Sequence, residues 1–209
     1  MTAHSPAKPA RLSPLPASFY DRPANVVAPA LLGHLLIRNT PQGRCGGVIV
    51  ETEAYLAEDP ACHAFGGQTE RNRAMFGAPG RAYVYLIYGM HYCVNAVCRP
   101  RGVGDAVLIR ALEPTLGLEL MRARRPVNRS HDLTNGPAKL CAALEIERGL
   151  DEADLCDAAS ALFIARNPHA DSTREELGPV ARGPRIGITK AAAVPLRFFL
   201  KRSPYVSDR

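Results

Sequence analysis

The chain has 209 residues, of which 46% are hydrophobic, so it is long enough for one large domain with a sizeable core. No apolar run approaches the roughly 20 residues that cross a bilayer, and residues 1–16 lack the pattern of a secretory signal, so a cytoplasmic protein is expected. The net charge of +6 favours an anionic partner such as nucleic acid. However, only four of the 26 basic residues are Lys and the rest are Arg, a bias that genome composition alone can produce.

The first half of the chain has the pattern of short strands. Residues 1–17 are rich in Pro, Ala and Ser and are expected to form a flexible arm ahead of a single domain over residues 18–209. A helix is predicted over residues 23–33, with Gly33 as its stop. Strands are then predicted over residues 34–38, 47–55, 82–87, 92–97 and 106–112. The polar, Gly-rich segment 59–80 is predicted to be a long functional loop.

The second half of the chain has more helical signals. Helices are predicted over residues 113–124, 135–146 and 151–154, and Pro137 lies near the first position of the second of them. Segment 167–183 is predicted to be a loop rich in Pro, Gly and charge, and strands are predicted over residues 185–188 and 196–200. There is no internal repeat and no strong linker, so the sequence predicts one mixed α+β domain.

Two carboxylates and an aromatic residue lie at strand spacing in segment 50–55. Residues two apart in a strand share a face, so Glu51, Glu53 and Tyr55 are expected to point together. A carboxylate on a sheet face must be solvated, paired or functional, because burying it without a partner is unfavourable. The pattern alone fits a wet sheet face with a local salt bridge as well as a catalytic site.

Three tyrosines lie on the predicted hairpin around Gly89. Tyr83 and Tyr85 share one face of the first strand, whereas Tyr88 has the opposite parity and lies beside the turn. Tyrosines within strands commonly pack across strands, but an aromatic residue at an exposed turn is harder to explain by packing. Insertion as a wedge between nucleic-acid bases is one physical use for it.

Arg110 lies near the end of the strand predicted over residues 106–112 and shares a face with Leu108. An Arg near Glu53 would favour the ionised carboxylate and could help to hold a water molecule, but an ordinary sheet ion pair fits equally well. The six cysteines contain no Cys-x-x-Cys pair and have no zinc-finger spacing to histidines, which predicts buried thiols and no metal site.

The chain resembles the 3-methyladenine DNA glycosylases of the alkyladenine (methylpurine) family over most of its globular part. The matching stretches are residues 31–33, 50–55, 68–73, 75–76, 83–90, 107–114, 135–141, 195–198 and 203–207. The resemblance implies a curved, mainly antiparallel sheet with flanking helices and a β-hairpin that inserts into DNA. It also implies a monomeric enzyme of the bacterial cytosol or nucleoid that acts on alkylated double-stranded DNA without a cofactor.

The resemblance also implies roles for single residues. Glu53 matches the general base that activates water for attack on the sugar, Arg110 matches a residue that positions this water, and Ile186 matches a position whose backbone carbonyl does the same. Tyr55, His63 and Tyr85 match residues that enclose the flipped base. Asn95 matches a residue that disfavours normal guanine, and Leu108 matches a pocket wall. Tyr88 matches the side chain that fills the gap left by the extruded nucleotide.

Contacts with the DNA backbone are expected from Arg71, Arg73, Met90, His91 and Lys139. His91 departs from the family pattern, in which a tyrosine often follows the Gly-Met turn, and the loop over residues 99–102 is longer and more basic than the family pattern predicts. These two departures leave the breadth of damaged-base substrates open.

The expected activity is hydrolysis of the glycosidic bond of alkylated purines, chiefly 3-methyladenine, to leave an abasic site. Lys139 is the only lysine inside a matching stretch and suits a phosphate contact better than a Schiff base, so water is the expected nucleophile. Two alternatives are a non-catalytic binder of distorted DNA, which gives Glu53 no task, and a carbohydrate hydrolase that uses Glu51 and Glu53 as a pair.

Overall fold

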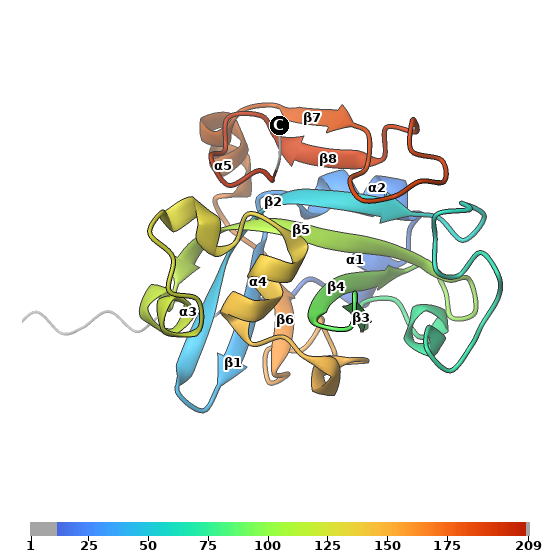
Figure 1. Cartoon of the computed structure of the whole chain (residues 1–209), viewed down its shortest axis with the longest axis horizontal. Coiled ribbons are helices and arrows are strands. Elements are labelled where there is room, and N and C mark those ends of the chain that lie inside the picture. The colour runs from blue at the N-terminus through green and yellow to red at the C-terminus, as the bar shows by residue number, and fades with distance from the viewer. Residues whose placement is uncertain (1–11, 208–209) are drawn as a thin grey trace, which may run out of the picture.

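The computed structural model describes residues 12–207 of the chain (Figure 1). In this range β3 (Ala82–Ile87), β4 (His91–Cys98), β5 (Asp105–Leu116), β2 (Gly43–Tyr55), β1 (Leu35–Thr40) and β6 (Leu162–Ala165) lie side by side in one curved sheet. Strand β8 (Arg197–Leu200) pairs with the second half of β2, and β7 (Val180–Gly183) pairs with β8. All of these pairs are antiparallel, which confirms the predicted α+β fold on a curved antiparallel sheet.

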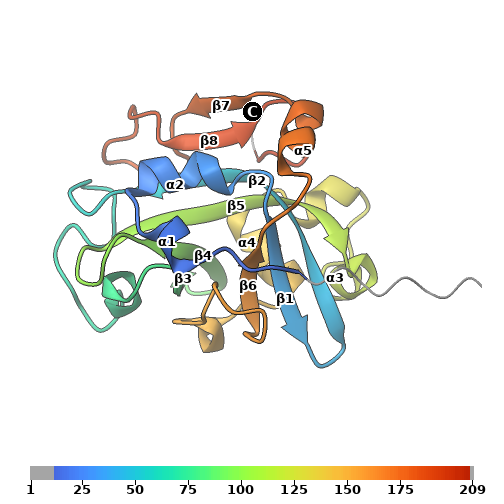
Figure 2. The ribbon, with the colours of Figure 1, turned by 180° about the vertical axis from the view of Figure 1, so that it is seen from behind.

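Helices flank the sheet on both faces (Figures 1 and 2). They are α1 (Ala17–Tyr20), α2 (Ala24–Leu31), α3 (Leu118–Arg124), α4 (Pro137–Leu144) and α5 (Ala170–Leu177), with short 3₁₀ turns η1 (Arg73–Phe76), η2 (Ser130–Leu133) and η3 (Arg148–Leu150). Helix α2 packs on β2 and β5, and α4 packs on β4 and β5 from the opposite side. Both helices bury one apolar face against the sheet, so the middle of β5 is enclosed from both sides.

Strand β2 carries the predicted carboxylates and is the central strand of the site. Its pairing with β5 is irregular between Gly46 and Gly47 and again around Glu51. A Cβ atom on Gly47 would lie 2.2 Å from the carbonyl oxygen of Glu113, so the close approach of the two strands there requires glycine. Such irregularities bend a strand. The first half of β2 therefore pairs with β1, whereas the second half, with Glu51 and Glu53, pairs with β8.

Several predicted elements agree with the structure. The predicted helix around residues 23–33 is α2, the two strands joined by the turn at residues 41–43 are β1 and β2, and the hairpin around Gly89 is β3 and β4. The helix predicted from Asn135 is α4, with Pro137 at its first position. The C-terminal strand is β8.

Four predictions from sequence were wrong. Residues 113–116 continue β5 instead of opening a helix, because Glu113 pairs with Val48 of β2, and the helix α3 starts only after Gly117. Residues 151–154 form no helix; the carboxylate of Asp151 accepts the backbone N–H of Val84 instead. The predicted loop 167–183 contains α5 and β7. The predicted strand 185–188 is irregular. Strand β6, an apolar run of four residues, was not predicted.

The boundary of the expected N-terminal arm falls partly within the described residues. Residues 1–11 lie outside them. Leu15 is fully buried, and its backbone N–H donates to the carbonyl oxygen of Ile164 at 2.9 Å. Pro14 forms a β-bridge with Ala165. The packed domain therefore begins before residue 18.

Within residues 12–207, no helix is both long enough and apolar enough to cross a membrane.

Candidate active site

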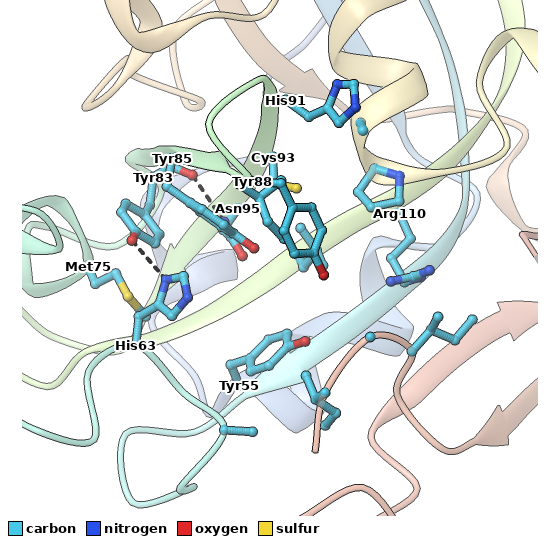
Figure 3. Close-up of a pocket in the computed structure, with 18 residues that line it drawn as sticks. Tyr55, His63, Met75, Tyr83, Tyr85, Tyr88, His91, Cys93, Asn95 and Arg110 are labelled. Carbon is cyan, nitrogen blue, oxygen red and sulfur yellow. Dashed lines mark hydrogen bonds between the residues drawn. The ribbon is translucent and has the colours of Figure 1, made fainter. Parts of the chain in front are cut away.

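A cavity of about 290 Å³ opens beside the hairpin of β3 and β4 (Figure 3). Its walls come from β2, β3, β4, β5, the start of α4 and the two loops before η1 and β8. The lining residues include Tyr55, His63, Met75, Tyr83, Tyr85, Tyr88, His91, Cys93, Asn95, Leu108, Arg110 and Ile186. The structure thus brings together the six residues predicted for the base pocket from segments that are far apart in the chain: Tyr55, His63, Tyr85, Asn95, Leu108 and Ile186.

Glu53 lies directly behind the cavity wall and is fully buried. Its Oε2 accepts the hydroxyl of Tyr55 at 2.9 Å, and its Oε1 accepts the backbone N–H of Ile186 at 2.8 Å and lies 3.2 Å from Nη1 of Arg110. These three partners all belong to residues that line the cavity. Burial raises the pKa of Glu53 above its ordinary value, and the charge of Arg110 and the two hydrogen bonds offset only part of this effect.

Glu51 has different surroundings, although it lies only two residues away. Its Oε1 accepts Nε of Arg197 at 2.6 Å and Nε of Arg110 at 3.2 Å. Its Oε2 accepts the backbone N–H of Ser207 at 2.8 Å and the hydroxyl of the same residue at 2.7 Å. Both oxygens are therefore saturated by fixed protein donors, and Glu51 does not line the cavity. The structure separates the two carboxylates, which strand parity alone could not do.

Arg110 connects the two carboxylates, since its Nε faces Glu51 and its Nη1 faces Glu53. Its Nη2 donates to the hydroxyl of Ser207 at 3.1 Å. Burial alone would lower the pKa of Arg110, but Glu53 and then Glu51 outweigh burial and raise this pKa, so the guanidinium stays charged. It supplies a fixed positive charge at the cavity wall next to Glu53.

Aromatic rings form one side of the cavity. The rings of Tyr83 and Tyr85 stack with centroids 5.3 Å apart, and the ring of His63 meets Tyr85 edge-on at 4.6 Å. Nδ1 of His63 is 2.9 Å from the hydroxyl of Tyr83. Burial and the charge of Arg71 lower the pKa of His63, which favours the neutral ring. Tyr55 stands across the cavity from Tyr85, so a flat ring could enter between them (Figure 3).

Two polar side chains at the cavity surface are held by hydrogen bonds. The side-chain amide of Asn95 donates to the carbonyl oxygen of Tyr83 at 3.1 Å, which holds Asn95 in one orientation at the cavity surface. Burial, and then the negative charge of Glu53, raise the pKa of Tyr55 far above its ordinary value, so the Tyr55 hydroxyl remains a donor to Glu53.

The tip of the hairpin is apolar and exposed. Tyr88 has 78% and Met90 70% of their surface exposed. Tyr88 has a φ of +53°, a conformation that is uncommon for a bulky residue, and Gly89 follows with a φ of +70°. The turn therefore presents an aromatic ring to solvent at the rim of the cavity instead of packing it.

The predicted DNA-backbone residues lie in different surroundings. Arg71 lies at the hairpin, where its Nη2 is 3.4 Å from the carbonyl oxygen of Leu86, and His91 lines the cavity rim. Lys139 is half-exposed at the start of α4 and donates to the side chain of Asn135 at 2.8 Å. Arg73 does not line the cavity, and its Nε pairs with Glu152 at 3.3 Å.

Sequence reasoning missed four charged or polar residues of the site. Arg197 and Ser207 hold Glu51, while Arg185 and Asp59 form a buried ion pair next to Tyr55. Ser207 lies in a stretch that carries the resemblance, but no pattern in the sequence gives its partner, which is 156 residues away. Within residues 12–207, no group of three or more His, Cys, Asp or Glu side chains is placed to hold a metal ion.

Comparisons with known proteins show the family of the chain. The methylpurine-DNA glycosylase family matches residues 18–204. A protein of Methanoculleus marisnigri is 49% identical over 197 residues, which cover 93% of this chain and 99% of the relative. A protein of Granulibacter bethesdensis is 48% identical over 193 residues, which cover 92% of this chain and 87% of the relative. Both relatives carry the provisional name of 3-methyladenine DNA glycosylase. The chain therefore belongs to the methylpurine-DNA glycosylase family, a family of DNA repair enzymes.

Proposed function

We propose that the protein hydrolyses the N-glycosidic bond of alkylated purines, chiefly 3-methyladenine, in duplex DNA and leaves an abasic site. The observation that carries this proposal is the position of Glu53, a buried carboxylate whose two hydrogen-bond donors and whose ion-pair partner all line an aromatic cavity. As an enzyme acting on DNA, it would work in the cytosol, and we propose that it acts as a monomer.

The first step is extrusion of the damaged nucleotide into the cavity. Unstacking and unpairing a base takes a few kcal/mol, and less for a damaged or mispaired base, which contributes selectivity. The exposed ring of Tyr88 at the hairpin tip is placed to enter the minor groove and fill the gap left in the base stack. Arg71, Arg73, Met90, His91 and Lys139 would contact the DNA backbone around this gap.

The second step is recognition of the extruded base between aromatic rings. An N-alkylated purine such as 3-methyladenine is cationic, and a cation against an aromatic face gains about 0.5–2 kcal/mol. Tyr55, His63 and Tyr85 would enclose the ring, and Leu108 would close the wall. Asn95 would clash with the exocyclic amine of normal guanine and disfavour it.

The third step is attack of water on C1′ of the sugar. Glu53 would take a proton from the water, and its raised pKa improves it as a base as long as it remains ionised. Arg110 and the backbone carbonyl of Ile186 would position the water. The negative charge of Glu53 would also stabilise the cationic character that develops on the sugar. The bond to an alkylated base is already weakened, so one carboxylate suffices.

The geometry argues against two other mechanisms. A carbohydrate hydrolase that uses both carboxylates would need Glu51 to be free, but its oxygens are saturated by four donors. A lyase would need a lysine at the sugar, but no lysine among the described residues lines the cavity. Borohydride trapping should therefore give no covalent adduct with DNA.

The test uses duplexes that each carry a single defined lesion, followed by alkaline cleavage at abasic sites. We expect cleavage with the wild-type protein and a loss of at least about 100-fold in rate for Glu53→Gln, the range typical of a general base. Glu53→Gln should still bind the lesion duplex. Absence of cleavage on every alkylated duplex would overturn the proposal, and cleavage by Glu53→Gln at the wild-type rate would remove Glu53 from the mechanism.

A further inference from the structure

A buried ion pair lies next to the cavity and has no role in the steps above. Nη1 of Arg185 is 2.5 Å from Oδ2 of Asp59, and the two side chains are 0% and 7% exposed. The same Nη1 donates to the backbone carbonyl of Ala54 at 3.1 Å. Removing two charges from water is unfavourable, and a buried pair is weak evidence for stability as such. The contacts of this ion pair indicate which parts of the site it holds in place.

The guanidinium of Arg185 lies over the ring of Tyr55, 4.7 Å from the ring centroid. Tyr55 lines the cavity, whereas Arg185 does not, so the guanidinium covers the ring face that points away from the cavity. Since a planar guanidinium stacks on an aromatic face, this contact fixes the plane of the Tyr55 ring. The plane of the ring in turn sets the direction of the hydroxyl that donates to Glu53.

The Asp59 end of the pair holds the loop that leads to His63. Oδ1 of Asp59 accepts the backbone N–H of Ala61 at 2.9 Å, and its backbone carbonyl accepts the N–H of Cys62 at 2.8 Å. These bonds close a tight turn immediately before His63. Asp59 therefore anchors the opposite wall of the cavity to the same guanidinium.

The Arg185 end holds the second loop. Its neighbour Ile186 lines the cavity and donates its backbone N–H to Glu53 at 2.8 Å. Arg185 therefore joins the loop that carries Ile186 to the loop that carries Asp59.

We propose that Arg185 and Asp59 are positioning residues that fix the distance between Tyr55, Ile186 and the His63 loop around the extruded base. The inference rests on the function proposed above. Neither residue touches the reacting atoms; they act through the two donors that Tyr55 and Ile186 give to Glu53. Catalytic groups need such support because small displacements reduce the rate strongly.

The test compares single-turnover excision by the variants Arg185→Met, Arg185→Lys and Asp59→Asn/Arg185→Met with the wild-type protein. Arg185→Met should slow excision at least about tenfold at saturating enzyme, and Arg185→Lys, which keeps the charge opposite Asp59, should recover part of the rate. The double variant removes the unpaired Asp59 charge, so it should regain thermal stability without regaining the rate.

The pH profile separates positioning from folding. Both donors favour the ionised form of Glu53, so loosening them should move the acid limb of the excision rate to higher pH in Arg185→Met. The charges of Arg110 and Glu51, which also face Glu53, are unchanged in these variants. The matched control is Arg182→Met on β7, whose guanidinium lies 5.2 Å over the ring of Phe198 away from the cavity, and it should excise at the wild-type rate.

Each outcome decides one question. If the wild-type protein excises nothing, the proposed function fails. Two results with an active wild-type protein would overturn this inference and leave the ion pair only structural. One is a double variant that regains both stability and rate, and the other is a wild-type rate and pH profile in all variants. If Arg185→Met does not fold, the double variant and Arg185→Lys still decide between positioning and packing.

Discussion

Glu51 and Glu53 are the clearest case of one residue type in two environments. Both are fully buried on β2, and both contact Arg110. Four protein donors saturate Glu51, whereas the Oε2 atom of Glu53 has a single donor, the hydroxyl of Tyr55 at the cavity wall. A carboxylate can act as a base only where a water molecule can reach it, so the surroundings of the two residues and not their type assign the task.

The surroundings of Glu53 predict how the excision rate falls at acidic pH. Burial raises the pKa of Glu53 above the ordinary value of 4.5, and a general base must be ionised. Single-turnover excision of 3-methyladenine should therefore fall as the pH drops through an apparent pKa above 4.5. The rate should fall about tenfold for each pH unit below that value. A rate that stays constant down to pH 4.5 would contradict this assignment of the base.

The side chains around Glu53 also show which contacts the sequence predicts and which it does not. The alternation in segment 50–55 places Glu51, Glu53 and Tyr55 on one face, and the structure agrees, since Arg110 meets both carboxylates and Tyr55 meets Glu53. The partners of these residues are not local. Ile186 lies 133 residues from Glu53, and no periodicity in the sequence specifies a contact of that separation.

The hairpin of β3 and β4 is an element whose shape follows from its sequence. Alternation predicts both strands, and Gly89 predicts the turn. Tyr85 lies in β3 and lines the cavity, whereas Tyr88 lies in the turn after β3, where its ring is exposed at the cavity rim, so the turn and not strand parity sets its direction. Where a prediction from local sequence and strand pairing conflict, pairing decides: residues 113–116 were predicted to open a helix but lie in β5 because β2 is beside them.

The exposed tip of the hairpin of β3 and β4 allows a test of insertion into DNA. Tyr88→Ala should weaken binding to a lesion duplex by about 1–3 kcal/mol, the range for an aromatic ring stacked on a base, which corresponds to roughly fivefold to 150-fold in Kd. Thermal stability should not change, since the ring has few contacts to lose. Tyr88→Phe, which keeps the ring, is the control. Wild-type affinity in Tyr88→Ala would contradict a role in filling the gap.

Ser207, in the segment that follows β8, allows a test of its contribution to the stability of the fold. The hydroxyl of Ser207 donates to Glu51 and accepts from Arg110, and it is buried. Ser207→Ala leaves both partners one bond short, so the free energy of unfolding, measured with urea, should fall by about 1–3 kcal/mol. Ser172→Ala on α5, where the hydroxyl is exposed, should change it by less than about 0.5 kcal/mol.

At the scale of the whole molecule, the positive charge matters through its position. Arg71 and Lys139 come from different halves of the chain, and each lies next to an element of the cavity. If each contacts a phosphate, the double variant Arg71→Gln/Lys139→Gln should reduce the slope of log Kd against log salt by about 1.8, which is two contacts at about 0.9 each. Fluorescence anisotropy with a labelled duplex measures this slope.

A matched control uses a cation that lies away from the cavity. Arg122 on α3 is half-exposed and pairs with Glu119 at 3.3 Å. Arg122→Gln should leave the slope unchanged, although it lowers the net charge of +6 by one. If Arg122→Gln reduced the slope by half as much as the double variant does, binding would depend on net charge alone and not on a defined face of the molecule.

The bonds between Glu51 and Ser207 also constrain the order in which the molecule can assemble. Ribosomes synthesise chains from the N-terminus, so β2 emerges while the residue that completes its charge cluster is still 156 residues away. Until residue 207 has left the ribosome, Glu51 lacks two of its donors and Arg110 lacks one acceptor. Nascent chains that have already formed most of the sheet are therefore expected to be without a finished active site.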